Sequence, residues 1–210
     1  MSPKIVLIAG PSGSGKTTLA RRIRLALGEE GCETIHLDDY FCEYEEPFEE
    51  HNYDVPEAYD FTQLVHDLTS LVEDKPIRRI RWNFDERKRV ILDESYLINP
   101  DVRVIVVEGL MALCDPALRK LAFLKIYLDV EPAIGICRRL SRDLSRKDRP
   151  GDPLSQVSRI ERHVIPGYRN HILPSKEFAD FVVVNDSFDK SGFNGVFGDE
   201  RKRPSNKKPN

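Results

Sequence analysis

The chain has 210 residues, of which 40% are hydrophobic and 32% are charged, and its net charge is −3. This suits one packed domain with a polar surface. The small net charge gives no general attraction to nucleic acid or membrane, and no stretch approaches the ~18 apolar residues of a membrane span. The chain enters an apolar run without room for a signal peptide, and its four cysteines form no CxxC pair. We therefore expect a cytoplasmic protein with no nucleic-acid or membrane partner; the sequence leaves a homo-oligomer open.

The first predicted elements frame a phosphate-binding loop. Residues 4–9 form an apolar run that predicts a buried strand, and from Lys16 apolar residues recur at helical spacing. Residues 10–17 between them fit the pattern GxxxxGK(S/T), in which the lysine reaches the outer phosphates of a nucleotide and the hydroxyl after it binds Mg²⁺. The alternative is an ordinary glycine-rich turn. The candidate phosphate-binding residues are Gly10, Ser12, Gly13, Ser14, Gly15, Lys16, Thr17 and Thr18, with Thr17 also a candidate metal ligand.

The following segments alternate between strand and helix patterns. Helices are predicted near 59–73, 131–146 and 153–171, the last interrupted near Pro166, and a β-hairpin is predicted near 77–92. Further strands are predicted at 33–37, 102–107, 124–130 and 181–184. Such alternation is typical of an α/β fold whose parallel sheet is covered by helices on both faces. We expect one domain over residues 1–186 and a disordered tail over 187–210, where periodicity is lost.

Acidic residues follow two of these strands. Asp38 and Asp39 come after the strand at 33–37, and Glu108 comes after the strand at 102–107. The carboxyl ends of strands form the ligand crevice of an open α/β sheet, so these acids should meet the phosphate loop. There Asp38 could accept a proton from an acceptor hydroxyl, and Glu108 could hold Mg²⁺ directly or through water. The alternatives are a helix cap for the Asp pair and a turn carboxylate for Glu108.

A basic helix supplies the third element. Arg139, Arg142 and Arg146 share one face by i, i+3 and i+4 spacing. Such a face can close over phosphates and stabilise the charge that moves with the γ-phosphoryl group, so we expect a lid near 138–160. The alternative is a solvated face balanced by Asp143 and Asp148.

The ordered set of motifs resembles the uridine kinase and phosphoribulokinase family. It comprises "GPSGSGKTT", "LDDYF", "NYDVPEAYD", "VVEGLMAL", "IYLDVEPAIGICRRLSRDLSRKDR" and "PSKEFADFVV", and it spans residues 3–185. The phosphate loop alone does not indicate this family, but the ordered set does. The resemblance implies a P-loop kinase fold that uses ATP with Mg²⁺ to phosphorylate a hydroxyl of a small ribose-like molecule.

The resemblance also implies roles for single residues. Asp38 matches the catalytic base and lies among the metal-side residues with Thr17 and Glu108, and Lys16 matches the phosphate-binding lysine. Asp54 matches an aspartate that holds ribose hydroxyls. Arg139 matches an arginine that contacts the same ribose as that aspartate. Arg142, Lys147 and Arg149 match lid positions. Of these, we count Arg142 as catalytic and Arg149 as substrate-binding.

The sequence departs from the family at the acceptor side. Trp82 and Phe84 keep an aromatic pair of the hairpin, but Arg87 stands where a histidine is expected, and Arg159 aligns with a base-reading glutamine. An arginine has only donors and a fixed positive charge, which suits a phosphate or carboxylate better than neutral uracil. Alternatively, both arginines point to solvent. We count all four residues as candidate substrate contacts.

Three functional hypotheses follow. The first is an ATP-dependent kinase of a small-molecule alcohol, with uridine or cytidine as the acceptor that the resemblance favours and an anionic sugar-like or hydroxy-acid acceptor as the alternative. The second is a GTPase-like switch, but "DRPG" and "DKSG" match DxxG outside a suitable strand context, and "NKKP" lacks the aspartate of NKxD. The third is a nucleotide-binding module without transfer activity, against which Asp38 and Glu108 argue.

Overall fold

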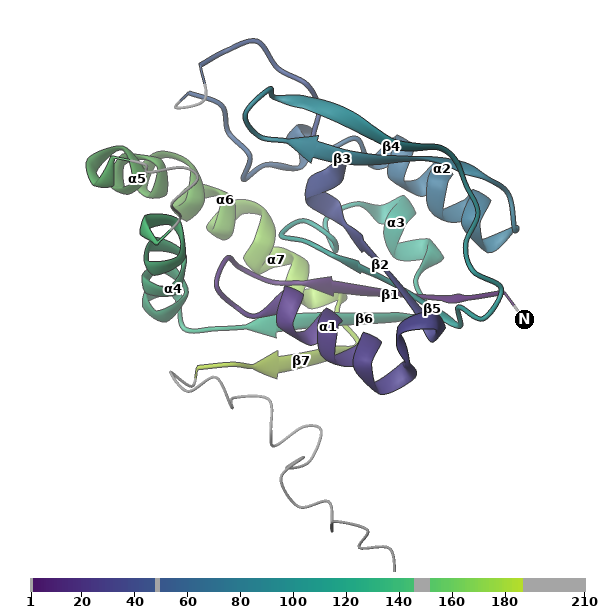
Figure 1. The fold of residues 1–210 in the computed structure, drawn as a ribbon. Coiled ribbons are helices and arrows are strands. Elements are labelled where there is room, and N and C mark those ends of the chain that lie inside the picture. The colour runs from purple at the N-terminus through teal and green to yellow at the C-terminus, as the bar shows by residue number, and fades with distance from the viewer. Residues whose placement is uncertain (1, 48–49, 146–151, 187–210) are drawn as a thin grey trace, which may run out of the picture.

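Five parallel strands form the central sheet, in the order β2-β5-β1-β6-β7 (Figure 1). The computed structural model describes residues 2–47, 50–145 and 152–186, and the predicted tail lies outside them. The strands are β1 (Lys4–Ala9), β2 (Cys32–His36), β5 (Val104–Glu108), β6 (Leu124–Asp129) and β7 (Phe181–Val184). All neighbouring pairs are parallel. The strand expected at 102–107 begins two residues later and includes Glu108, so this acid is the last residue of β5.

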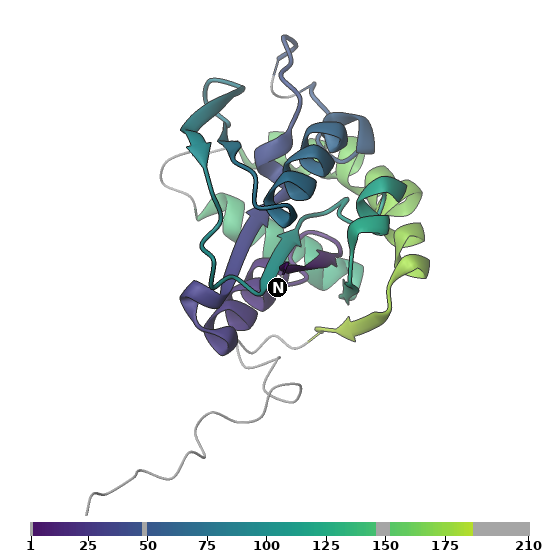
Figure 2. The same cartoon turned by 90° about the vertical axis from the view of Figure 1, so that its right-hand side faces the viewer.

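Helices cover both faces of the sheet, as the sequence predicts. Side chains alternate along β1, so Ile5 and Leu7 face one side and Ile8 the other. On the Ile8 side packs α1 (Lys16–Leu27), and on the opposite side pack α2 (Phe61–Val72) and α3 (Pro116–Leu121). Figure 2 shows α1 and α2 on opposite sides of the sheet. Burial on both faces explains the nearly continuous apolar run of β1.

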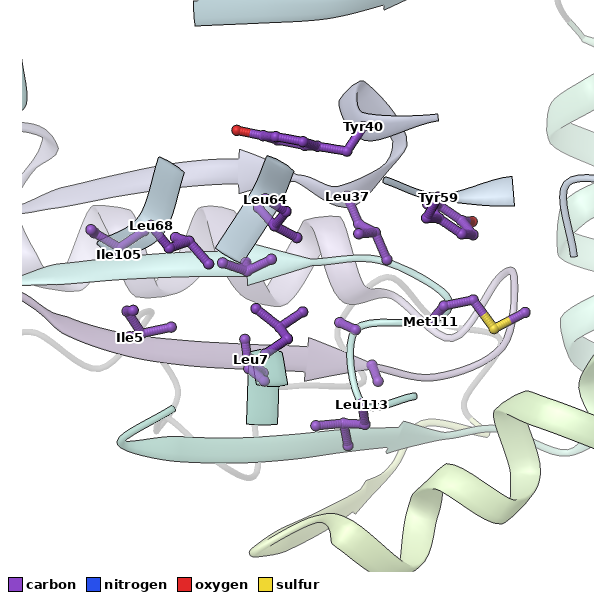
Figure 3. Close-up of a cluster of buried hydrophobic side chains, with 14 of the residues drawn as sticks. Ile5, Leu7, Leu37, Tyr40, Tyr59, Leu64, Leu68, Ile105, Met111 and Leu113 are labelled. Atoms are coloured by element: carbon purple, nitrogen blue, oxygen red, sulfur yellow. The ribbon is translucent and has the colours of Figure 1, made fainter. Parts of the chain in front are cut away.

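The larger core lies between the sheet and α2. Leu64 and Leu68 of α2 are fully buried against Ile5, Leu7 and Ile105 (Figure 3). Three short 3-10 turns, η1 (Glu29–Gly31), η2 (Leu37–Tyr40) and η3 (Pro56–Ala58), connect the elements of the first half. Because Leu37 is buried in this core, the turn η2 that begins with it is anchored directly at the end of β2.

The predicted hairpin forms a separate antiparallel sheet beside the core. It comprises β3 (Ile77–Asn83) and β4 (Lys88–Tyr96), so its second strand runs four residues beyond the expected end. Trp82 joins the hairpin to the large core. Arg87, directly before β4, has a positive φ of 57°, a backbone conformation that is uncommon outside glycine.

The helices α4 (Pro132–Leu144) and α5 (Pro153–Arg159) lie beyond the carboxyl ends of β1 and β6 (Figure 1). The first of them begins with Pro132 at its first turn, with the side chain of Glu131 accepting a hydrogen bond from the amide of Ile134. A further helical run leads to β7. Its segments are α5 (Pro153–Arg159), η4 (Ile160–Val164), α6 (Ile165–Gly167), η5 (Tyr168–Ile172), α7 (Leu173–Ser175) and η6 (Lys176–Phe178).

The interruption predicted near Pro166 is wrong, because the helical run continues through this residue. A π-helical segment precedes Pro166, and another precedes Pro174. In the first, the amide of Ile165 donates to the carbonyl of Ile160, five residues back. The π turn changes the spacing of the backbone hydrogen bonds from i→i−4 to i→i−5 next to Pro166, which has no amide hydrogen to donate. The helix therefore continues through the proline. Within the described ranges, no helix is long and apolar enough to cross a membrane.

Candidate active site

The carboxyl ends of β1, β2 and β5 open into a cavity of about 760 Å³. The phosphate loop follows β1, η2 follows β2, and Glu108 ends β5. Because parallel strands end at the same edge of a sheet, three segments far apart in the sequence meet there. The predicted residues that line the cavity are Ser12, Lys16, Thr17, Asp38, Asp54, Phe84, Arg87, Glu108, Arg139, Arg142 and Arg159.

The phosphate loop depends on glycine at two close approaches. Gly10 has φ 143° and Gly13 has φ 78°, both in the region that side chains disfavour. A Cβ atom at Gly10 would lie 2.2 Å from the carbonyl oxygen of Leu128, and one at Gly13 would lie 2.5 Å from that of Gly135. The loop therefore lies directly against the end of β6 and the first turn of α4, where no larger residue fits.

The side chains of Arg138, in α4, and Asn185, directly after β7, hold this loop in place. The amide of Asn185 donates to the carbonyl of Ser14 at 2.8 Å, and Arg138 donates to the carbonyls of Gly13 and Asn185 at 3.0 and 2.9 Å. Arg138 therefore belongs to the support of the loop. Its neighbour Arg139 points to the cavity, because adjacent helical residues face different directions.

Lys16 is buried at the base of the cavity. Its ammonium group donates to the carbonyls of Gly10 and Pro11 at 2.9 and 3.0 Å. Burial lowers the pKa of Lys16 to about 8, although the negative charges of Glu108 and Asp38 oppose the shift. These two acids thus help the lysine to stay charged where an anionic ligand can reach it.

Glu108 and Thr17 are joined directly. The hydroxyl of Thr17 donates to Oε1 of Glu108 at 2.9 Å. Burial raises the pKa of Glu108, but the hydrogen bond with His36 and the charge of Lys16 outweigh it, so the pKa is lowered overall. A buried carboxylate that remains ionised beside a hydroxyl supplies the hard oxygen ligands that Mg²⁺ prefers.

The two aspartates of "LDDYF" have different surroundings. The carboxyl group of Asp38 opens into the cavity, yet the enclosing protein and then the charge of Glu108 raise its pKa to about 6. Asp39 turns away and accepts a hydrogen bond from the backbone amide of Trp82 at 3.2 Å. Neither caps a helix, since η2 has no side-chain cap. Only Asp38 is therefore placed to contact a ligand in the cavity.

Asp54 and Arg139 form the predicted pair. Nη1 of Arg139 lies 3.6 Å from Oδ1 of Asp54, and Asp54 is only 1% exposed. Arg139 is also 3.6 Å from Asp143, and Arg142 donates to the same aspartate at 3.0 Å. Asp143 thereby aligns the two arginines along the cavity wall. Nothing in the sequence patterns singled it out beyond its place as a balancing charge.

The hairpin contributes to the cavity differently from the prediction. Phe84 lines the cavity, but Trp82 does not: it is 4% exposed and packs behind the wall, 5.7 Å from the ring of Phe41. The assignment of Trp82 as a direct wall residue is therefore wrong for this structure. Phe41 and Tyr53 take that place in the lining. Their position depends on the packing of the two rings against each other, 4.6 Å apart, which spacing does not show, although Tyr53 stands within the motif "NYDVPEAYD".

Arg87 and Arg159, the two arginines that depart from the family, both border the cavity. Arg87 donates to the carbonyl of Glu46 at 3.0 Å and lies 5.9 Å from the ring of Tyr44. It therefore also links the hairpin turn to the segment that contains these two residues. Arg159 is 6% exposed and lies 5.7 Å from the ring of Tyr53. Burial lowers the pKa of Arg159. Arg149, like Lys147 and Arg146, lies outside the described residues.

The parallel sheet, the phosphate loop and the acids at the strand ends define a P-loop kinase of small molecules. The sequence matches the Phosphoribulokinase / Uridine kinase family over residues 5–187, and the chain belongs to this family. It is 36% identical to the uridine kinase of Ligilactobacillus salivarius (strain UCC118) over 185 residues, covering 86% of this chain and 84% of the relative. It is 34% identical to the uridine kinase of Clostridium botulinum (strain Okra / Type B1), with 86% and 87% covered.

A solved structure supports the fold independently. Phosphoribulokinase from Rhodobacter spheroides superimposes with a TM-score of 0.64, covering 87% of this chain and 70% of that chain, at 13% identity. At this identity the likeness concerns the fold alone. The predicted family and fold class are thus confirmed, as is the small-molecule kinase among the three functional hypotheses.

Proposed function

We propose that the protein transfers the γ-phosphoryl group of ATP to a hydroxyl of a pyrimidine nucleoside, uridine or cytidine. The observation that carries this proposal is the convergence of Lys16, Asp38 and Glu108 in the cavity that also contains the Asp54–Arg139 pair. The first three side chains suit the phosphates of a nucleotide, its metal ion and the transfer of a proton, and the Asp54–Arg139 pair suits neighbouring hydroxyls of an acceptor. The two curated relatives named uridine kinase favour a nucleoside among molecules with such hydroxyls.

In the proposed reaction, Asp38 is the general base. Its carboxylate accepts the proton of the acceptor hydroxyl as the acceptor oxygen bonds to the γ-phosphorus. The bond between that phosphorus and the β,γ-bridging oxygen breaks, and ADP leaves with the bonding electron pair. Lys16 and Arg142 stabilise the negative charge that spreads over the phosphate oxygens.

We assign Mg²⁺ to Thr17 and Glu108, with Asp38 on the same side. When bound with a nucleotide, Mg²⁺ would neutralise part of the negative charge of the phosphates. The described residues hold no cluster of three or more His, Cys, Asp or Glu. This suits Mg²⁺, which usually keeps several waters and takes only one or two protein carboxylates together with phosphate oxygens.

We assign the acceptor to the side of the cavity between the hairpin turn and α4. Asp54 and Arg139 would hold its hydroxyls, and Phe41, Tyr53 and Phe84 would pack against an apolar ring. The loop of the hairpin would thus serve as a substrate-side wall. We propose the predicted region 138–160 as a lid over the phosphates; of this region, the structure describes residues 138–145 and 152–160. We infer a cytoplasmic enzyme that acts on small molecules, with residues 1–186 as its kinase domain.

A second acceptor class is favoured by Arg159 and Arg87. Both border the acceptor side, and Arg159 keeps its guanidinium inside the protein. A bidentate arginine bond to phosphate or carboxylate is strong and selective in geometry. An anionic sugar-like alcohol or hydroxy acid is therefore the alternative acceptor. The contact of Arg87 with Glu46 weakens this alternative, because it gives Arg87 a structural partner.

A coupled assay for ADP formation, run with nucleosides, pentose phosphates and hydroxy acids in competition, tests the acceptor class. We expect uridine or cytidine to give the highest kcat/KM. Arg87→His should leave that ranking unchanged, and a pentose phosphate should remain poor in both proteins. If an anionic acceptor is best, and Arg87→His lowers its kcat/KM by roughly the one to two decades of a charge-assisted bond, the alternative is correct.

A further inference from the structure

His36 contacts the buried acid of the active site from the strand next to it. In the register of β2 with β5, His36 lies directly opposite Glu108 at the carboxyl ends of the two strands. Its Nδ1 is 2.8 Å from Oε1 of Glu108. The hydroxyl of Thr17 donates to this same oxygen. One oxygen of the carboxylate is thus held from two directions.

The histidine acts as the donor in this contact. Glu108 is 7% exposed and ionised, and an ionised carboxylate can only accept hydrogen bonds. Nδ1 of His36 therefore carries the hydrogen. The bond fixes the orientation of a carboxylate that Thr17 alone would leave free to rotate about its own bond.

His36 approaches Glu108 from outside the catalytic cavity. It is absent from the cavity lining, and it lines instead a separate hollow of about 180 Å³ between β2 and the base of the hairpin. Its side chain is 46% exposed there. Since the ring does not reach the space where ligands bind, its direct contact with the ligand-binding residues is the hydrogen bond to Glu108.

We propose that His36 is a positioning residue, which holds Oε1 of Glu108 so that Oε2 is presented to the magnesium ion. The inference rests on the metal role of Glu108 in the proposed function. Groups that hydrogen-bond a ligating carboxylate orient it, and their loss typically weakens metal affinity or activity by about 10–100-fold. No motif in the sequence marks His36, because its role comes from the strand register.

The test is a titration of the enzyme–ADP complex with Mn²⁺, read from the EPR signal of free Mn²⁺. His36→Ala should raise the Mn²⁺ dissociation constant by about 10–100-fold, while ADP affinity without metal stays unchanged. His36→Asn should recover most of the affinity, because its amide nitrogen lies as many bonds from the backbone as Nδ1. His36→Gln, whose amide lies one carbon further out, should stay close to His36→Ala.

Thr34→Ala is the matched control. Thr34 lies two residues earlier on β2, lines the same hollow and pairs with Val106, so its loss disturbs the strand without touching Glu108. It should bind Mn²⁺ as the wild type does. If His36→Ala does not fold, the comparison of His36→Asn with His36→Gln decides alone. Wild-type Mn²⁺ affinity in His36→Ala, or equal affinity in the Asn and Gln variants, would overturn the inference.

Glu108→Gln in the same titration separates this inference from the proposed function. If Glu108→Gln weakens Mn²⁺ binding and His36→Ala does not, only the role of His36 is wrong. If Glu108→Gln leaves Mn²⁺ binding unchanged, the metal role of Glu108 is wrong, and the inference about His36 is overturned with it.

Discussion

At the scale of single residues, Asp38 and Asp39 show how position decides chemistry. They are identical neighbours, yet one opens into the cavity and the other binds the backbone of the hairpin. Asp38→Asn should keep ADP affinity and lower kcat by about 10²–10⁴-fold, because an amide cannot accept the proton. Asp39→Asn, which can still accept the bond from Trp82, is the control and should stay near the wild-type rate. Near-normal turnover in Asp38→Asn would remove this residue from the role of base.

Asp38 and Lys16 together predict the pH dependence of the rate. The enclosing protein around the cavity and the charge of Glu108 raise the pKa of Asp38 to about 6, and a base works only when deprotonated, so kcat/KM should rise with pH through that value. Burial lowers the pKa of Lys16 to about 8, and its charge is needed, so kcat/KM should fall above that value. A kcat/KM that does not change across pH 6 would contradict the assignment of Asp38.

Residue patterns reveal some of these roles and not others. Lys16 and Thr17 are visible in the sequence because the phosphate loop is one continuous segment with fixed spacing. Tyr53 and His36 are not, because each acquires its contact from an element distant in the chain. The error at Trp82 has the same origin: the pattern shows an aromatic residue on the hairpin, but only the packing on Phe41 shows that it faces the core.

At the scale of elements, the strands were predicted best. Residues 4–9 match β1 in full, since buried parallel strands are continuous apolar runs. Residues 181–184 match the edge strand β7 in full, although most of its side chains are exposed. The helical run before β7 was predicted poorly at Pro166. A proline normally ends a helix, and the π turns that accommodate it here leave no signal in the spacing of apolar residues.

This helical run also shapes the acceptor site, through Gly167. A Cβ atom there would lie 2.2 Å from the backbone oxygen of Asp54. Gly167→Ala should therefore displace Asp54 or α6, lower stability by about 1–3 kcal/mol and raise the KM of the acceptor. The affinity for ADP should stay unchanged, because the phosphate loop lies on other elements.

Thermal unfolding and steady-state kinetics measure the two effects. Gly31→Ala is a suitable control, since a Cβ there meets only the guanidinium of Arg103, which can move aside. An acceptor KM in Gly167→Ala equal to that of the wild type would show that α6 does not determine the position of Asp54.

At the scale of the whole molecule, the sheet brings the proposed nucleotide end and the proposed acceptor end into one cavity. The phosphate loop and Glu108 come from β1 and β5, while the proposed acceptor side is lined by Phe41, Tyr53 and Asp54, by the hairpin turn and by α4. A nucleotide switch needs only the phosphate loop and the metal-side acid, and no acceptor side. The presence of both halves is what favours transfer to an acceptor over hydrolysis.

The most direct test of this central claim follows the label of [γ-³²P]ATP in the presence of Mg²⁺ and uridine or cytidine. We expect the label to appear in the nucleoside monophosphate, its transfer to depend on the nucleoside, and Asp38→Asn to abolish most of it. Label found only in inorganic phosphate, at a rate independent of any acceptor, would show hydrolysis instead of transfer.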